Sequence, residues 1–282
     1  MIFNQDKIAL TSYTYIINAV DTVKSYNEGY ITNLFFGEEH CTLLIKNNLL
    51  NVVCYEKCIF ILYEDHDFFH LYFICSNEKI LADSLRELMN NYTGYTFVAD
   101  IIGTEINTKK IAEVFSRVGF SIYTTLYRMR RSKNLDEPQI VDTKTEKAIP
   151  DHAEQVFNIF EKYFDRYSEQ LPLLEEIMQF ISNNCIFVIT EQQKVLAFVI
   201  FEIKGLTSYL RYWFVLPECR DKKLGSAILR RYFYESRNTK RQIFWVLASN
   251  ENAIIRYKHY GFEAEPMIDQ IMIKSNNDCK VL

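Results

Sequence analysis

The chain has 282 residues, of which 49% are hydrophobic and 24% charged, which excludes a disordered, collagen-like or low-complexity protein. The formal net charge of -4 argues against a nucleic-acid partner, because binding to nucleic acids normally needs a basic face. No apolar run reaches the roughly 18–20 residues that span a bilayer, and no basic flank with an apolar stretch opens the chain. We therefore expect a cytoplasmic protein with no membrane partner.

The cysteines and histidines show no disulfide or metal pattern. The cysteines are odd in number and irregularly spaced, at positions 41, 54, 58, 75, 185, 219 and 279. We interpret them as free thiols of a reducing compartment, since Cys54 and Cys58 are four apart and do not form a C-x-x-C pair. His66 and His70 would share one strand face about 13 Å apart, which is too far for one ion. We expect no metal.

In the first half of the chain, hydrophobic periodicity and turn residues predict elements from residue 68 onward. They are strands at 68–75, 95–101 and 122–129, and helices at 80–90 and 109–118. A polar segment that contains a proline then follows, from Arg130 to Pro138. We take this segment as the boundary between two domains, residues 1–135 and 140–282, each of ordinary size.

The second half also alternates between helical and strand patterns, which predicts an α/β fold class. The predicted helices are at 151–164, 171–181, 225–236 and 250–260, and the predicted strands at 185–190, 195–203, 209–215, 242–247 and 263–273. Near the end of each half, an amphipathic helix leads into the next strand through a Gly-Phe pair, Gly119-Phe120 and Gly261-Phe262. We interpret the matching order of elements as a diverged internal duplication, the alternative being coincidence of a common helix-cap signal.

A short basic loop between the strand at 209–215 and the next helix carries the strongest chemical signal. It contains Arg220, Lys222 and Lys223 and leads into Gly225. The amides at a helix start lack internal partners and favour anions, so the loop suits a phosphate, and Gly225 would leave room for its approach. The alternative is a solvated basic loop that only caps the helix.

A second segment begins with Asn250, a residue typical of helix N-caps. Ala253 and Tyr257 follow on one face of the predicted helix, four residues apart. A small residue beside a phenol can admit a ligand and offer it a proton. The alternative is a core tyrosine packed beside an alanine.

These two segments together resemble the GNAT superfamily of acyl-CoA-dependent N-acetyltransferases, over about residues 145–275. Arg220, Lys223 and Gly225 occupy the first, fourth and sixth places of the family's pyrophosphate loop. The later helix matches the family at every motif position: Asn250, Ala253, Tyr257, Gly261 and Phe262. The resemblance implies two GNAT-like domains in tandem, each with a mostly antiparallel sheet flanked by helices.

One position departs from the family pattern, because Lys223 stands where the family has glycine. Either Lys223 takes a positive φ at a cost of about 1 kcal/mol or more, or the loop has ordinary φ there and the ammonium assists phosphate binding.

The resemblance also implies roles for individual residues. The main chain of Phe214 and Val215 would pair with the pantetheine arm of acetyl-CoA, the co-substrate. The other implied cofactor contacts are Arg220, Asp221, Lys222, Lys223, Leu224, Gly225, Ser226, Asn250, Ala253 and Tyr257. Tyr257 would also protonate the departing thiolate as acetyl passes directly to a primary amine of a small molecule, amino acid or peptide. Glu202 is the nearest acid that could serve as base; a surface role for Glu202 and a water-relayed base are the alternatives.

The first half lacks the residues of both motifs. Its equivalent loop, Ser76-Asn77-Glu78-Lys79, has no Gly and no Arg, and Phe115 stands in the position that corresponds to Tyr257. We interpret it as a degenerate GNAT-like domain without cofactor binding, the alternative being an unrelated α+β domain. For the whole chain, a non-catalytic acyl-CoA sensor and an interaction module on the same scaffold remain open, as does a monomer or a homodimer.

Overall fold

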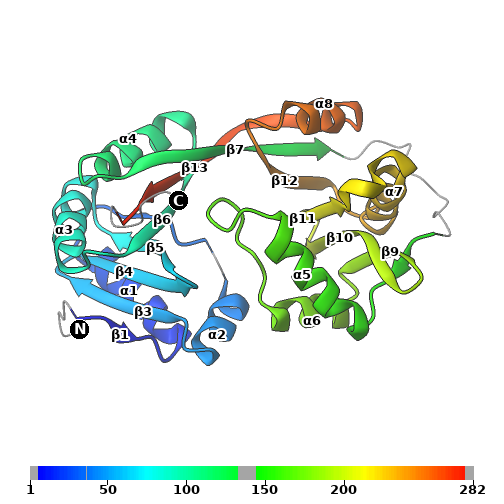
Figure 1. Ribbon diagram of the computed structural model, residues 1–282. Coiled ribbons are helices and arrows are strands. Elements are labelled where there is room, and N and C mark those ends of the chain that lie inside the picture. The colour runs from blue at the N-terminus through cyan, green and yellow to red at the C-terminus, as the bar shows by residue number, and fades with distance from the viewer. Residues whose placement is uncertain (1–5, 36, 133–143, 277–282) are drawn as a thin grey trace. The chain divides into compact units, whose positions relative to one another are not determined.

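A computed structural model describes residues 6–35, 37–132 and 144–276 (Figure 1). The chain divides into two compact units. Unit 1 contains the described residues up to Leu126 and those from Pro266 on, and unit 2 runs from Tyr127 to Glu265. The residues 133–138 of the expected boundary segment lie outside the described residues.

Unit 1 contains most of the N-terminal elements and the end of the last strand. They are β1 (Ile8–Ala9), α1 (Tyr13–Ser25), β2 (Ile31–Thr32), α2 (Glu38–Lys46), β3 (Leu50–Tyr55), β4 (Cys58–Asp65), β5 (Phe68–Cys75), α3 (Glu78–Asn91), β6 (Thr96–Gly103), α4 (Glu105–Ser116), the start of β7 (Ser121–Ser132) and the end of β13 (Glu263–Lys274).

The sheet of unit 1 follows the order β1-β3-β4-β5-β6-β13, and only the β5–β6 pair is parallel among these described pairs. Phe60, Leu71 and Phe73 pack with α3 and α4 in one core cluster. The opposite face meets α1, where the Tyr15 hydroxyl lies 3.0 Å from Cys54 Sγ. Strands covered on both faces do not alternate between apolar and polar residues, which explains the apolar runs 52–55 of β3 and 58–63 of β4.

The last strand joins unit 1 through β6. Their antiparallel register runs from Ile268 opposite Gly103 to Lys274 opposite Phe97. This pairing is why residues from Pro266 on group with unit 1, whereas the expected division placed them in the second domain.

A buried acid pair lies in the β6–β13 ladder. Asp269 is opposite Ile102 and is therefore a diagonal neighbour of Asp100 on the same face, and both are less than a tenth exposed. Burial raises the pKa of Asp269 well above its usual value, and the charge of Asp100 and a hydrogen bond between the two carboxyls add to the rise. Pairing of β13 with β6 therefore favours the protonated form of Asp269.

Unit 2 holds the remaining elements. They are the end of β7, β8 (Glu146–Lys147), the 3₁₀ helix η1 (Pro150–His152), α5 (Ala153–Tyr163), α6 (Leu174–Ser182), β9 (Ile186–Glu191), β10 (Lys194–Lys204), β11 (Thr207–Val215), the 3₁₀ helix η2 (Pro217–Lys222), α7 (Leu224–Glu235), β12 (Arg241–Leu247), α8 (Glu251–His259) and the start of β13.

The sheet of unit 2 runs β12-β11-β10-β9-β8, with a parallel β11–β12 pair and otherwise antiparallel described pairs. Aromatic rings fix helices on its faces. Phe198 meets Phe160 of α5 at 5.4 Å between ring centroids, and Phe201 meets Tyr232 of α7, also at 5.4 Å. The predicted α/β class with mostly antiparallel sheets flanked by helices is confirmed (Figure 1).

The two Gly-Phe junctions have the same hydrogen-bond pattern. Gly119 N bonds Ser116 O and Phe120 N bonds Phe115 O, and Gly261 N bonds Lys258 O while Phe262 N bonds Tyr257 O. Both glycines have positive φ, as a helix C-terminus of this type requires. The pattern aligns Phe115 with Tyr257 and supports the duplication.

The predicted elements are present, each within a few residues of its expected bounds, whereas those before residue 68 were not predicted. The six cysteines among the described residues are free, as expected, and Cys279 lies outside them. No helix in the described part of the chain is long and apolar enough to cross a membrane.

Candidate active site

The central strand of unit 2 separates from its parallel neighbour halfway along its length. The register of β11 with β12 ends at the pair Tyr209 and Ile243. On the other edge, Ile200 pairs with Tyr212 but Phe201 pairs with Leu210, which leaves Arg211 as an extra residue. Such a β-bulge bends its strand, and here it lies where the two strands part. The second half of β11 is therefore free to pair with a ligand on its β12 side.

Strand alternation decides which main-chain groups face this opening. Leu216 N donates to Leu196 O at 2.9 Å, so the groups of Leu216, and by alternation those of Phe214, point toward β10. The main-chain groups of Trp213 and Val215 point to the opposite edge of β11, toward β12. The geometry supports Val215 as a main-chain contact but not Phe214, whose ring packs against Phe164 and Phe198.

The loop after β11 has the left-handed conformation that the family's glycine would supply. Lys223 has φ 58° and ψ 18°, between η2 and α7. Of the two alternatives raised by this lysine, the structure has the one with positive φ. The left-handed region costs a side chain with a Cβ about 1–2 kcal/mol.

Free amides gather where α7 begins. The first intrahelical bond is donated by Ala227 N to Lys223 O at 3.2 Å, so the amides of Leu224, Gly225 and Ser226 have no intrahelical acceptor. Lys223 provides no side-chain cap for them. Three amides at the positive end of a helix dipole form an anion site without any side chain.

Charged side chains surround these amides. Arg220, Asp221, Lys222 and Lys223 are exposed, while Leu224 is buried and can contribute only its main chain. Lys222 lies 3.7 Å from Glu191 in an exposed ion pair. Such pairs are weak, so the lysine can exchange its partner for a phosphate at little cost.

Two loop residues also have contacts within the fold. A Cβ on Gly225 would lie 3.3 Å from Trp213 and 3.5 Å from Val215, so this glycine lets α7 pack closely on β11. The Ser226 hydroxyl accepts a hydrogen bond from the Tyr260 hydroxyl at 3.1 Å, which ties the end of α8 to the start of α7.

Tyr257 lies beside the opening in β11. Its ring contacts Trp213 of β11 at 5.5 Å and Phe244 of β12 at 4.3 Å between centroids, so it stands by both strands where they part. Burial raises the pKa of the Tyr257 phenol above its usual value, so it keeps its proton at neutral pH. Asn250 caps this helix, since its Oδ1 accepts from Ala253 N at 3.2 Å.

Glu202 is on β10, opposite Tyr209. Its carboxylate lies 3.2 Å from Lys204 Nζ and 3.6 Å from Arg211 Nε. Its role as base stays a prediction.

The corresponding opening in unit 1 is filled by the chain itself. Here the β5–β6 register ends at His70 and Val98. β2 pairs with the end of β5, Ile31 opposite Cys75 and Thr32 opposite Ile74. Because β4 holds the other edge of these same β5 residues, β2 lies on the β6 side, where a ligand would otherwise pair.

Asn33 completes this closure and is itself buried. Its Oδ1 accepts from Phe73 N at 2.7 Å, and its Nδ2 donates to Leu71 O at 3.0 Å and to Asp100 O at 3.1 Å. One side chain thus bridges the two parted strands.

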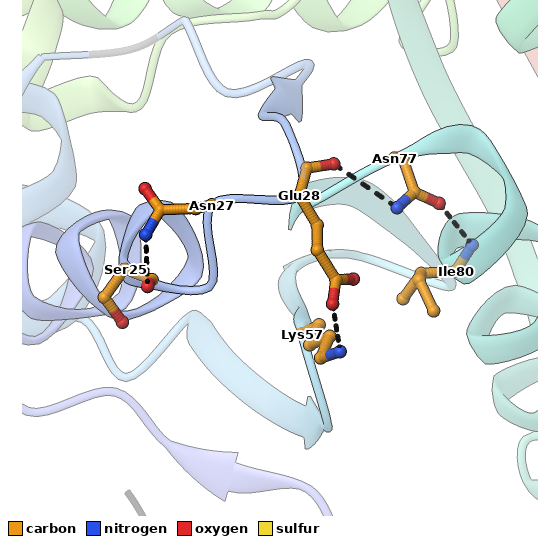
Figure 2. A network of polar contacts seen from close by, with 6 residues as sticks. All are labelled: Ser25, Asn27, Glu28, Lys57, Asn77 and Ile80. Carbon is orange, nitrogen blue, oxygen red and sulfur yellow. Dashed lines mark hydrogen bonds and ion pairs between the residues drawn. The ribbon is translucent and has the colours of Figure 1, made fainter.

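The segment before β2 also covers the loop equivalent to residues 220–226 (Figure 2). Asn77 caps α3 by accepting from Ile80 N at 3.1 Å, and its amide donates to Glu28 O at 3.5 Å. The Glu28 carboxylate pairs with Lys57 at 2.6 Å. Unit 1 therefore fills with its own residues the places that correspond to the open strand edge and the loop of unit 2.

No group of three His, Cys, Asp or Glu in the described part of the chain could hold a metal ion. His66 and His70 do not share a strand face as expected. His66 is in the turn before β5, and Asp65 lies between them, 2.7 Å from His66 and 3.4 Å from His70.

Several features of this site were not predicted from the sequence. The Arg211 bulge depends on the register with β10 and leaves no local signal. The contacts of Trp213 with Tyr257 and of Tyr260 with Ser226 join segments far apart in the chain. The spacing of Tyr257 and Tyr260, three residues apart on a helix, could have suggested that both face β11 and α7.

Comparison with known proteins finds similarity to the superfamily that the sequence motifs resemble. Residues 182–264 match the family model described as an acetyltransferase (GNAT) domain. A tandem GNAT protein from the clavulanic acid biosynthesis pathway aligns over 98% of this chain and 99% of its own, with 11% identity and a TM-score of 0.61. No curated protein matches the chain.

Two other solved structures are similar over nearly the whole chain. A GCN5-related N-acetyltransferase from Kribbella flavida covers 93% of this chain and 97% of its own, at 11% identity and a TM-score of 0.56. A GNAT-family acetyltransferase from Colwellia psychrerythraea covers 95% and 98%, at 10% identity and a TM-score of 0.54. At such identities the likeness is one of fold.

Proposed function

Because residues 182–264 form a GNAT acetyltransferase domain within a tandem GNAT fold, we propose that unit 2 transfers an acetyl group from acetyl-CoA directly to a primary amine. The observation that carries the proposal is the combination in one unit of a parted strand pair, three free helix-start amides and a protonated phenol.

In this proposal each part of acetyl-CoA has a matching part of unit 2. The diphosphate meets the amides of Leu224, Gly225 and Ser226, with Arg220 and Lys223 supplying positive charge. The pantetheine arm pairs with the outward main chain of β11 at Trp213 and Val215. Its thioester then comes to the side of β11 where Tyr257 contacts Trp213.

The reaction joins the amine nitrogen to the thioester carbonyl and expels the coenzyme as a thiolate. Holding amine and thioester together supplies most of the acceleration, up to roughly 7–11 kcal/mol for well-placed reactants. An outward N–H of β11 polarises the carbonyl, and Tyr257 gives its proton to the leaving sulfur.

Binding and chemistry can be tested separately on the full chain. Calorimetry with coenzyme A measures binding, and release of free thiol from acetyl-CoA measures turnover over a panel of primary amines. The panel contains 2-phenylethylamine, spermidine, lysine and short peptides. Absence of coenzyme A binding by folded protein refutes the proposal, and binding without turnover over the panel points to a sensor.

Tyr257→Phe isolates the proton donor. The variant keeps the ring contacts with Trp213 and Phe244 and loses only the hydroxyl. We expect turnover to fall about 100-fold, in the range of general acid catalysis, with acetyl-CoA affinity within twofold of wild type. Tyr260→Phe is the matched control, since that hydroxyl bonds Ser226. Unchanged turnover in Tyr257→Phe removes the phenol from the acid role.

A further inference from the structure

The segment between α5 and α6 lies against the β11 strand. The Tyr212 hydroxyl donates a hydrogen bond to Gln170 O. The Phe164 ring contacts Tyr212 and Phe214 at centroid distances of 5.9 and 5.5 Å. These contacts hold residues 164–170 beside the half of β11 that parts from β12.

Glu169, on this segment, has a carboxyl oxygen that the fold leaves unsatisfied. Glu169 Oε2 is buried and has no hydrogen-bond partner among the described residues. In the neighbouring acid Asp165, by contrast, each carboxyl oxygen has a hydrogen-bond donor. Oδ2 accepts from Ser168 Oγ at 2.6 Å and Oδ1 accepts from Tyr167 N at 3.3 Å. A buried carboxyl oxygen without a partner costs free energy and needs an explanation.

Glu169 belongs to the segment on the face of β11 that carries Tyr212 and Phe214, whereas Tyr257 contacts Trp213, whose side chain points to the other face. Burial, and then the charge of Asp165, raise the pKa of Glu169 to about 7. Its own charge adds to the burial that raises the pKa of both Tyr212 and Tyr257. The other charged groups that act on these phenols are Arg256 of α8, Arg211 and Glu202 of the sheet and Glu176 of α6.

We propose that Glu169 is the base of the reaction, receiving a proton from the ammonium group of the acceptor. The inference rests on the proposed function of unit 2. It assigns the orphan oxygen a partner, because an ammonium is a donor of both hydrogen bond and charge.

The proton balance is closed without any further reactant. The ammonium gives one proton to the Glu169 carboxylate, which later passes it to solvent. The freed nitrogen pair forms the C–N bond, the C–S bond breaks, and the thiolate takes the Tyr257 proton. The nitrogen then loses a second proton, which restores the phenol, and keeps the third as the amide N–H.

Glu169→Gln is the direct test, with the panel amine that wild type acetylates fastest. We expect kcat/KM for the amine to fall about 100-fold at pH 7 while coenzyme A affinity stays within twofold. Wild-type kcat/KM should be level above pH 7 and fall below it. In the variant, kcat/KM should rise tenfold per pH unit, because the fraction of free amine rises in this way. The kcat/KM values of variant and wild type should therefore converge at high pH.

A second readout does not need turnover. At pH 7 a carboxyl of pKa about 7 is half protonated, so binding of the amine to the complex with coenzyme A should release about half a proton. Calorimetry in two buffers of different ionisation enthalpy counts that proton, and Glu169→Gln should release none. A merely structural role would lower activity equally at every pH and leave proton release unchanged.

Two further variants separate the outcomes. Glu175→Gln changes an exposed carboxylate at the start of α6 and should behave as wild type. Glu202→Gln tests the competing base. If Glu202→Gln has the altered pH profile and Glu169→Gln does not, the inference is wrong while the acetyltransferase proposal stands. If wild type acetylates no panel amine, it is the proposed function that has failed.

Discussion

Replacing Lys223 by glycine is expected to stabilise unit 2, although it removes a side chain. Lys223 has φ 58° at the first residue of the turn into α7. Glycine relieves about 1–2 kcal/mol of left-handed strain. It also removes a cation from the positive end of a helix dipole, a gain of about 0.3–1 kcal/mol.

Glycine also has a cost, because it gives the unfolded chain more conformational freedom. That cost is about 0.4–1 kcal/mol. The sum is a net stabilisation of about 1 kcal/mol. With a urea dependence of about 1–3 kcal/mol/M, the unfolding midpoint should rise by roughly 0.5 M.

Tryptophan fluorescence is a suitable probe of this change. The chain has two tryptophans, and both Trp213 and Trp245 lie in unit 2. Lys222→Gly is the matched control, with the same charge loss and the same glycine entropy at a position without positive φ. We expect it to destabilise unit 2 by up to about 1 kcal/mol. Equal effects of the two variants would refute the conformational argument.

Two predictions concern unit 1. Asn33→Ala should destabilise it by about 2–5 kcal/mol, because three buried main-chain groups lose their partner. The variant should not create coenzyme A binding. Urea unfolding followed by circular dichroism measures the stability and calorimetry the binding, with Asn47→Ala, which loses one hydrogen bond, as control. Since the pKa of Asp269 is raised, its contribution to stability is full below pH 4 or so and is lost as the pH rises. Asp269→Asn should therefore stabilise unit 1 more at pH 8 than at pH 5, and an equal effect at both would contradict the assignment.

The sequence allowed the local geometry that depends on spacing along one segment to be predicted, while the roles of these residues stay predictions. Gly225, Ala253 and Tyr257 belong to single strand-loop-helix or helix stretches, where a fixed spacing implies a fixed geometry. The Gly261-Phe262 junction was likewise predictable, because a helix that ends in this way needs positive φ.

What could not be predicted depends on pairing between distant segments. Arg211 becomes a bulge only through the register of β10 with β11. In the sequence, Asn33 has no feature that distinguishes it from other loop asparagines. Its role depends on three main-chain partners that come from two distant strands. Glu169 could not be distinguished from the chain's other acids until burial left one of its oxygens without a partner.

The two units differ in what occupies the edge of their parted strands, which supports the proposal that only unit 2 binds acetyl-CoA. Main-chain groups in a half-closed opening cost free energy unless they are hydrogen-bonded. In unit 1, β2 and Asn33 bond these groups permanently, so a ligand would have to displace folded structure. In unit 2 the described register of β11 with β12 stops at Tyr209, so in the proposed function the groups beyond it would exchange only water for a ligand. The degenerate character predicted for unit 1 would then mean that its own chain takes the ligand's place.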